Sequence, residues 1–202
     1  MIRRTAAGFA LALALVAGAG ASGCGYRGSA VDVSPRAIAA EPGWITVRDV
    51  PLVEQQGKSD CGAAALTMLL RFWGADASTT LADVAGALPS DPEKPGQRAG
   101  DLRDLARARG LEAFLVTGEI ADLETQLAQG RPLLVGLLKP VGIPLGKRQR
   151  ALSHYEIVIG YHPEKKLVLT LDPAEGLRKN TVEGFAREWE PSKRLALIAF
   201  KK

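Results

Sequence analysis

Sulfur and aromatic rings are scarce in this sequence of 202 residues, which has two cysteines, two methionines and aromatic residues at 5% of positions. It contains no CxxC motif and no cluster of residues with the spacing of metal ligands. A disulfide-stapled or metal-stapled fold is therefore not expected. The GxxxxGK[ST] loop that cradles nucleotide phosphates is also missing, so we expect no nucleotide and no cofactor.

The sequence also has little excess of charge of either sign, since it contains 26 basic and 22 acidic residues and has a formal net charge of +4. Two of the positive charges, Arg3 and Arg4, lie in a segment that we expect to be removed. The remaining Lys and Arg are scattered among acids, which argues against binding to nucleic acid. With 47% hydrophobic residues, a chain of this length can bury the core of one globular domain.

The N-terminus has the features of an export signal. A positive start is followed by a small apolar run over residues 6–21, which is too short and too rich in glycine for a membrane span. The run ends in Ala-Ser-Gly-Cys24, which resembles the lipobox of bacterial lipoproteins. This resemblance implies a lipoprotein signal peptide over residues 1–23, acylation of Cys24 and the membrane as a partner. A plain secretory signal that leaves Cys24 as a thiol is the alternative.

The residues that follow predict where the domain begins. Gly25 comes after Cys24 in place of an aspartate, and in Gram-negative lipoproteins that pattern implies the periplasmic face of the outer membrane. Without acylation the protein would be periplasmic or secreted. Residues 24–43 contain Gly, Ser, Ala and two Pro, which is typical of a flexible tether. We expect one folded domain over residues 44–202.

Hydrophobic periodicity places helices early and strands late, which favours an α+β fold over a doubly wound sheet. A long loop with a basic tip at residues 147–150 is expected over 139–152, and a Pro- and Gly-rich loop over 89–100. We expect helices over residues 61–73, 80–88, 101–109, 120–129 and 181–188, and strands over 44–53, 111–117, 132–138, 154–161, 166–172 and 194–200.

Cys61 begins the clearest of these helices, which is apolar nearly all round and is therefore expected to run through the core. A helix N-terminus has unpaired N–H groups and a positive potential, and both favour the thiolate, the nucleophilic form of cysteine. Ser59 or Asp60 can cap the start of this helix, and Gly74 can end it. Taken alone, Cys61 fits a buried structural cysteine equally well.

The two histidines differ in their surroundings. His162 precedes a proline in a turn and is expected to be solvated, whereas His154 starts an apolar strand. If a three-residue turn over 162–164 joins the two strands, antiparallel pairing places His154 directly opposite Asp172, with Cβ atoms about 5 Å apart. A loop longer or shorter by one residue would put the two on opposite faces. Structural roles for both residues stay open at this point.

Gln55 lies six residues before Cys61. A side-chain amide at this place can join the backbone N–H of Cys61 as a pair of donors to an oxyanion. Gln56 is a near-duplicate that the spacing does not exclude.

Together these residues resemble a known family. The segment QQGKSDCGAAALTML, from Gln55 to Leu69, resembles the N-terminal motif of the bacteriocin-processing, double-glycine-leader peptidases (cysteine peptidase family 39). HYEIVIGY, which starts at His154, resembles their histidine strand, and LDPA, which contains Asp172, resembles their Asp-Pro segment. The resemblance covers roughly residues 50–176. It implies a papain-like fold with a nucleophile helix packed on an antiparallel sheet, a triad of Cys61, His154 and Asp172, and Gln55 in the oxyanion hole.

The function that this resemblance implies is hydrolysis of a peptide bond in an exported peptide or protein, with cleavage after a Gly-Gly leader as one option. Typical members are fused to a membrane exporter, and we expect this chain to be a stand-alone, lipid-anchored version. Two alternatives stay open: a membrane-anchored module of the same fold that binds peptides without cutting them, and a papain-like acyltransferase or amide hydrolase.

Overall fold

The computed structural model describes residues 28–75, 78–91, 93, 95–141 and 150–201. The predicted signal peptide, Cys24 and residues 147–149 of the basic tip lie outside this range. None of the helices within it combines the length and the apolar composition of a membrane span. The elements in chain order are β1 (Val31–Asp32), α1 (Pro35–Ala40), β2 (Ile45–Thr46), α2 (Cys61–Phe72), α3 (Leu81–Ala87), α4 (Ala99–Ala108), β3 (Glu112–Thr117), α5 (Ile120–Ala128), β4 (Leu133–Val141), β5 (Arg150–His162), β6 (Leu167–Asp172), β7 (Gly176–Thr181), α6 (Val182–Trp189), the 3-10 turn η1 (Glu190–Ser192) and β8 (Leu195–Phe200).

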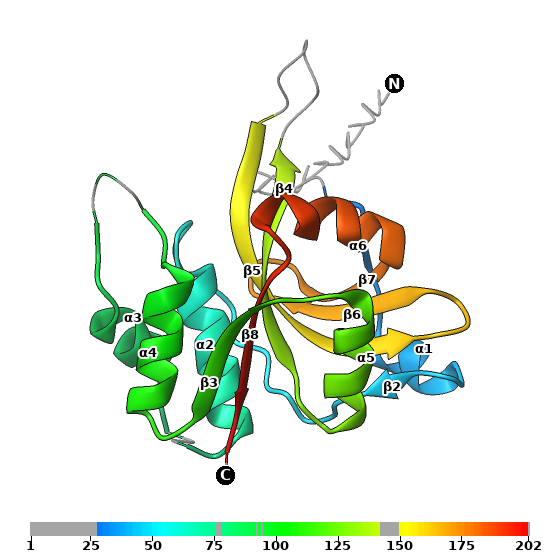
Figure 1. Ribbon diagram of the computed structural model, residues 1–202, viewed down its shortest axis with the longest axis horizontal. Helices are drawn as coiled ribbons and strands as arrows, with labels where there is room; N and C mark the ends of the chain where they lie inside the picture. Colours follow the sequence, from blue (N-terminus) through cyan, green and yellow to red (C-terminus); the bar gives the residue numbers. More distant parts are fainter. Residues whose placement is uncertain (1–27, 76–77, 92, 94, 142–149, 202) are drawn as a thin grey trace, which may run out of the picture.

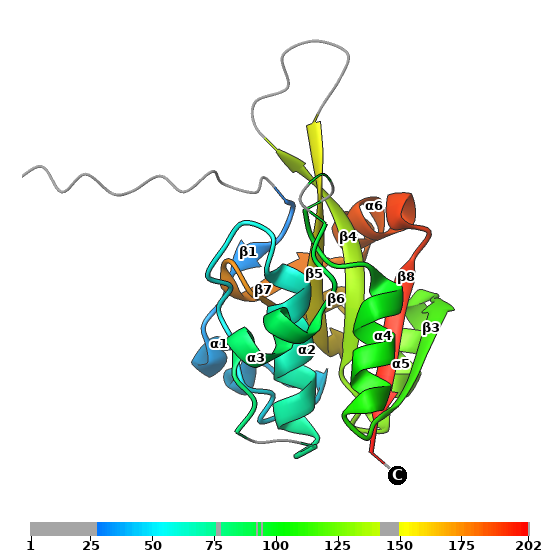
Figure 2. The same ribbon diagram turned by 90° about the vertical axis from the view of Figure 1, so that its left-hand side faces the viewer.

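The strands form one antiparallel sheet in the order β1-β7-β6-β5-β4-β8-β3, and β2 pairs with β5 off that path. Figure 1 shows α2, α3 and α4 gathered on one side of β4 and β5, with α5 and α6 on the other. Figure 2 shows the same layers turned by 90°, with α2, α3 and α4 toward the viewer. The predicted α+β arrangement is therefore confirmed.

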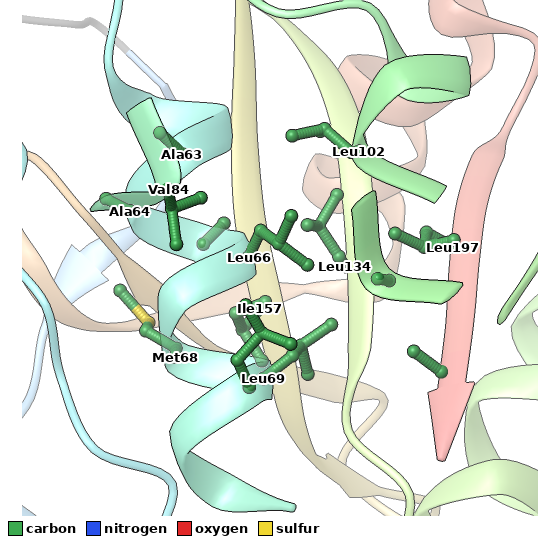
Figure 3. Packing of buried hydrophobic residues seen from close by; sticks show 14 of the residues in the cluster. Ala63, Ala64, Leu66, Met68, Leu69, Val84, Leu102, Leu134, Ile157 and Leu197 are labelled. Atoms are coloured by element: carbon green, nitrogen blue, oxygen red, sulfur yellow. The ribbon is translucent and has the colours of Figure 1, made fainter. Parts of the chain in front are cut away.

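Alternation along the central strands builds a hydrophobic core on each face of the sheet. On β5, Ile157 packs into the cluster beneath α2, α3 and α4, and the next residue, Val158, packs into the cluster beneath α5 and α6. Figure 3 shows the first cluster, in which Leu66 and Leu69 of α2 lie beside Ile157. Contacts between the apolar side chains of α2 and those of the sheet thus fix the position of the helix.

Helix α2 matches its prediction closely, since it runs from Cys61 to Phe72 and every residue up to Leu70 is buried. Small side chains in its first turns allow this burial. The one polar side chain within the buried stretch, Thr67, donates its hydroxyl hydrogen to the carbonyl of Ala63 (2.7 Å). Gly74, with φ of 59°, ends the helix as expected.

The pairing of β5 with β6 differs from the prediction. The turn has four residues (163–166), because His162 pairs with Leu167, and Lys166 closes it with φ of 52°. A bulge at Ile159 then shifts the register. Continuing the pairing from Ile157 and Leu171 puts Glu156, and not His154, directly opposite Asp172, so the predicted direct pairing is wrong by two residues.

The bulge nevertheless keeps His154 and Asp172 on the same face of the sheet. Before the bulge, Gly160 pairs with Leu169, and this register alone would place Asp172 opposite Ile157. Residue 157 faces the side of the sheet opposite to His154. The extra residue at the bulge places Asp172 opposite Glu156, which is two residues from His154. His154 and Asp172 are therefore diagonal neighbours on one face.

The flexible tether predicted over residues 24–43 is wrong from residue 28 onward. Strand β1 pairs with β7, Ser34 caps α1, and Ser29 donates two hydrogen bonds to Glu188 of α6, from its N–H (2.7 Å) and its hydroxyl (2.9 Å). The polar residues of this segment serve as caps and turn formers. Strand β7, which the sequence analysis did not predict, supplies the edge that β1 covers.

The strand predicted over residues 44–53 is also shorter in the structure, where only β2 pairs with the sheet. Val47 adds one further bond to the carbonyl of Ile159 (2.8 Å). Asp49, with φ of 61°, then turns the chain toward the loop that leads to Cys61. Pro51 follows, and its missing N–H could not continue a ladder of hydrogen bonds.

Candidate active site

Cys61 is the first residue of α2, and its thiol is free and only 7% exposed. Asp60 is the N-cap residue, but its carboxylate makes no capping bond and instead accepts from the N–H of Gly57 (2.8 Å). The prediction of a capping side chain at Asp60 is therefore wrong. The N–H groups of the first turn of α2 are consequently left for a thiolate or an oxyanion at this position.

The structure brings His154 of β5 together with Asp172 at the end of β6. The Nε2 atom of His154 lies 2.7 Å from Oδ1 of Asp172, and both side chains are fully buried. The N–H of Ala174 donates to the same oxygen (2.8 Å). Because the carboxylate can only accept, Nε2 carries the proton of the neutral imidazole, and Nδ1 is the nitrogen left for another partner.

The Cys61 side chain acts on this imidazole, since it is one of the groups that raise the pKa of His154. Burial opposes a charged imidazole, but the hydrogen bond to Asp172, the side chain of Cys61 and the charges of Asp172 and Glu156 outweigh it. Asp172, Cys61 and Glu156 together raise the pKa of His154 to about 9. Burial would also raise the pKa of Asp172, but its bonds and charge contacts with His154 and Lys139 hold it well below its usual value. The imidazole of His154 is thus supported in its charged form beside Cys61.

Two charged residues of this cluster escaped the sequence analysis. The ammonium group of Lys139, on β4, donates to Oδ2 of Asp172 (2.7 Å) and also forms an ion pair with Glu156 of β5. Lys139 is 1% exposed and Glu156 is 2% exposed. The loop predicted over residues 139–152 begins at Lys139, whereas in the structure β4 continues to Val141. Glu156, a single acid inside an apolar strand, was the available signal that a buried cation lies nearby.

His154, Glu156 and Asp172 also have the arrangement of a metal site, since one ligand atom from each lies within 4.8 Å of the others. However, the ammonium group of Lys139 contacts both carboxylates. It brings the positive charge that a bound cation would supply, so these residues do not fit a metal ion as they stand.

Gln55 lies next to the turn that follows Asp172. Its backbone N–H donates to the carbonyl of Pro173 (2.9 Å), and its side-chain Nε2 donates to the carbonyl of Gly57 (3.0 Å). Gln55 is half-buried, whereas Gln56 is exposed. These contacts tie the loop before Cys61 to the segment that carries Asp172, and they distinguish Gln55 from its neighbour in the sequence.

A close contact beside Cys61 favours glycine at position 62. A Cβ atom there would lie 2.9 Å from Oε1 of Gln97 and 3.1 Å from the ring of Tyr155. The hydroxyl of Tyr155 donates to the backbone carbonyl of Gln97 (3.1 Å). Burial, together with the charges of Cys61 and Asp101, raises the pKa of this hydroxyl to about 12. Gln97 and Tyr155 therefore form a wall next to Cys61, which the sequence alone did not reveal.

His162 is buried, and the prediction of a solvated turn residue is wrong. Its Nε2 donates to the carbonyl of Pro42 (3.0 Å), its Nδ1 accepts from the N–H of Lys165 (3.3 Å), and Trp44 packs edge-on against the ring. The segment before β2 covers this histidine, which fastens that segment to the turn between β5 and β6. It takes no part in the cluster around His154.

A buried helix that carries a cysteine at its start, packed on an antiparallel sheet, is the fold of a papain-like cysteine peptidase domain. The profile of the Peptidase_C39 like family matches residues 47–197, and the chain belongs to this family. A comparison with curated proteins finds no significant match.

Solved structures show the same fold. A double-glycine-motif protease from an AMS/PCAT transporter, in complex with the leader peptide, has a TM-score of 0.59 and 23% identity over 78% of this chain and 94% of its own. The peptidase domain of Streptococcus ComA has a TM-score of 0.59 and 21% identity over 76% of this chain and 100% of its own. A C39-like peptidase from Bacillus anthracis has a TM-score of 0.61 and 18% identity over 79% of this chain and 98% of its own.

The raised pKa of His154 makes a prediction about stability and pH. A histidine whose pKa is about 9 when folded and about 6.5 when unfolded stabilises the fold fully below pH 6.5, and this stabilisation is lost as the pH rises through 9. The free-energy difference between the wild-type protein and His154→Gln, measured by urea unfolding, should therefore shrink between pH 6 and pH 10 by on the order of 3 kcal/mol. Asp172 does not interfere, because the stabilisation due to its lowered pKa is lost only at acidic pH. A difference that stays constant over this range would contradict the assignment.

Proposed function

We propose that this protein is a cysteine peptidase in which Cys61 is the nucleophile, His154 the general base and acid, and Asp172 the residue that orients the imidazole. One observation carries the proposal: Asp172 holds one ring nitrogen of His154, and a cysteine at a helix N-terminus is near enough to raise the pKa of the same imidazole. Membership of the Peptidase_C39 like family supports the same conclusion.

In the proposed reaction, His154 takes the thiol proton and the thiolate of Cys61 attacks the peptide carbonyl. A C–S bond forms and the carbonyl electron pair moves onto oxygen. The oxyanion accepts hydrogen bonds from the backbone N–H of Cys61 and from the side-chain amide of Gln55. His154 then protonates the leaving amine as the C–N bond breaks, which leaves a thioester. Water, deprotonated by His154, attacks this thioester and releases the acid and the thiol.

The substrate we propose is an exported peptide or protein. The solved protease from the AMS/PCAT transporter is in complex with a leader peptide, which supports a peptide as the ligand class for the shared fold. Cleavage after a Gly-Gly leader is the narrower form of this proposal. Gln97 and Tyr155, packed against Gly62, limit the space beside Cys61 and are consistent with small side chains in the substrate.

We also propose that the protein is exported and anchored to a membrane, at the periplasmic face of the outer membrane, through a lipid on Cys24. The support comes from the sequence before and at this cysteine, and from Gly25 directly after it. The folded part begins shortly afterwards, since Ser29 already bonds to Glu188.

The catalytic proposal predicts a loss of activity at two positions. In a Cys24→Ser background, Cys61 is the only cysteine, and it should be alkylated at neutral pH faster than the thiol of a model peptide. Cleavage of a proteome-derived peptide library, followed by mass spectrometry, should fall at least about 1,000-fold in Cys61→Ala and His154→Ala. The exposed neighbour variant Ser153→Ala should cleave like the wild type. If Cys61 reacts no faster than the peptide thiol, activation by His154 is refuted.

The oxyanion role predicts a difference between two adjacent glutamines. Gln55→Ala should lower kcat by about 100-fold to 1,000-fold because a donor to the oxyanion is lost, with KM nearly unchanged. Gln56→Ala should keep kcat within about twofold, because surface substitutions rarely perturb a distant site. Urea unfolding of both variants separates a catalytic effect from the loss of the bond between Gln55 and Gly57. Equal kcat values for the two variants would remove Gln55 from the mechanism.

The anchoring proposal predicts that Cys24→Ser abolishes metabolic labelling with an alkyne fatty acid and moves the protein from the membrane fraction to the soluble fraction. Cys61→Ser, the matched control, should remain labelled and membrane-bound. Retention of the label in Cys24→Ser would show that the lipidation site was assigned wrongly.

A further inference from the structure

The proposed mechanism makes no use of Lys139 and Glu156, although both are buried behind His154. The pairing of β4 with β5 places Leu137 opposite His154 and Val135 opposite Glu156. Since alternate residues share a face, Lys139 projects from the same face of the sheet as Leu137 and His154. Three adjacent strands thus direct four ionisable side chains to one buried point.

Burial of this lysine and this acid needs an explanation, because removing charges from water is costly. An ion pair in the interior usually adds little stability compared with well-packed apolar residues. Fold stability alone would therefore be served as well by two aliphatic side chains at these positions. The position of the pair, in direct contact with the carboxylate that holds His154, suggests a role in the site.

Lys139 fixes the orientation of the Asp172 carboxylate. Oδ2 accepts from the ammonium group of Lys139 (2.7 Å), while Oδ1 lies 2.7 Å from His154 Nε2 and 2.8 Å from the N–H of Ala174. With both oxygens held, the carboxylate cannot rotate away from the imidazole. Without Lys139, Oδ2 would be a buried oxygen with one strong donor fewer.

Glu156 balances the charge that Lys139 brings. Burial raises the pKa of Glu156, and the adjacent ammonium group of Lys139 opposes that rise. With all three groups ionised, Lys139 contributes +1, Asp172 contributes −1 and Glu156 contributes −1, so the group behind His154 has a net charge of −1. Without Glu156, the ammonium group would cancel the charge of Asp172, and the imidazolium would lose its electrostatic support. Glu156 therefore restores the negative charge, while Lys139 retains its hold on Asp172.

We propose that Lys139 and Glu156 are positioning residues: Lys139 fixes the carboxylate that orients His154, and Glu156 keeps the net charge behind the imidazole at −1. This inference rests on the proposed function, because it assigns the pair to the site of Cys61, His154 and Asp172.

Among the described residues, the charged and titratable groups around His154 are Cys61 from α2, Lys139 from β4, Glu156 from β5 and Asp172 from β6. Burial lowers the pKa of His154, and the charges of Asp172 and Glu156 act in the opposite direction. Removal of the Glu156 charge should therefore lower the pKa of the imidazole, and the direction does not depend on the identity of the substrate.

A direct readout exists because the chain has only two histidines. Protein labelled with ¹³C at histidine Cε1 gives two NMR signals, and His154→Asn assigns them. In Glu156→Gln the titration midpoint of His154 should fall by about one pH unit. The exposed control Glu164→Gln should leave the midpoint unchanged. An unchanged midpoint in Glu156→Gln would overturn the charge-balancing role.

The double variant Lys139→Met/Glu156→Leu separates orientation from charge. Replacing both members of the pair with apolar residues should preserve the fold. The net charge behind His154 stays at −1, so its midpoint should remain near that of the wild type. The Asp172 carboxylate loses its anchor, and kcat should fall at least about 10-fold with KM nearly unchanged. Wild-type kcat in a folded double variant would show that the pair is only structural. If the wild-type protein cleaves no peptide, the proposed function fails, whereas the NMR titration still tests the charge balance.

Discussion

The bond between His154 and Asp172 is the interaction on which the arrangement of the site depends. It requires β5 and β6 to present both side chains on one face, and side chains alternate at every residue of a strand. The four-residue turn alone would set the wrong parity, and the bulge at Ile159 corrects it. A local irregularity of one residue thus decides whether the imidazole meets its carboxylate, and the carbonyl of Ile159 in turn accepts a bond from Val47.

Helix α2 and the sheet divide the requirements of the proposed thiol chemistry between them. The helical layer supplies a buried, rigid helix whose first turn has N–H groups without a side-chain cap. The sheet supplies the imidazole and the charges behind it, held by strands with a hydrophobic core on both faces. Small residues at the start of α2 let the helix approach the sheet closely, and Gly62 lies against Tyr155 of β5. The site is sensitive to changes in charge, because its four buried ionisable groups must compensate one another.

The sequence predicted the parts of the fold that depend on local pattern. Helix α2 and the later strands have clear periodicity, and the motif around Cys61 identified the family. Lys139 could not be found in this way, because a lysine before a proline and a basic loop has the local pattern of solvated chain, and only the pairing of β4 with β5 buries it. The same holds for His162, whose burial depends on contacts with residues about 120 positions earlier in the chain. Contacts between residues far apart in the sequence bury both Lys139 and His162, and such contacts cannot be predicted from local composition.

The N-terminal segment is docked on α6, and this limits how far the domain could lie from a membrane that holds Cys24. Only four residues separate Cys24 from Ser29, whose bonds to Glu188 fasten the chain to α6. The five Cα–Cα steps from Cys24 to Ser29 span at most about 18 Å even when fully extended. With a lipid on Cys24, the domain would be held almost in contact with the headgroups, with α6 on the side nearest the bilayer. An enzyme held in this way would not reach far into the surrounding compartment. It would meet chiefly polypeptides that are inserted in, or emerging from, the same membrane.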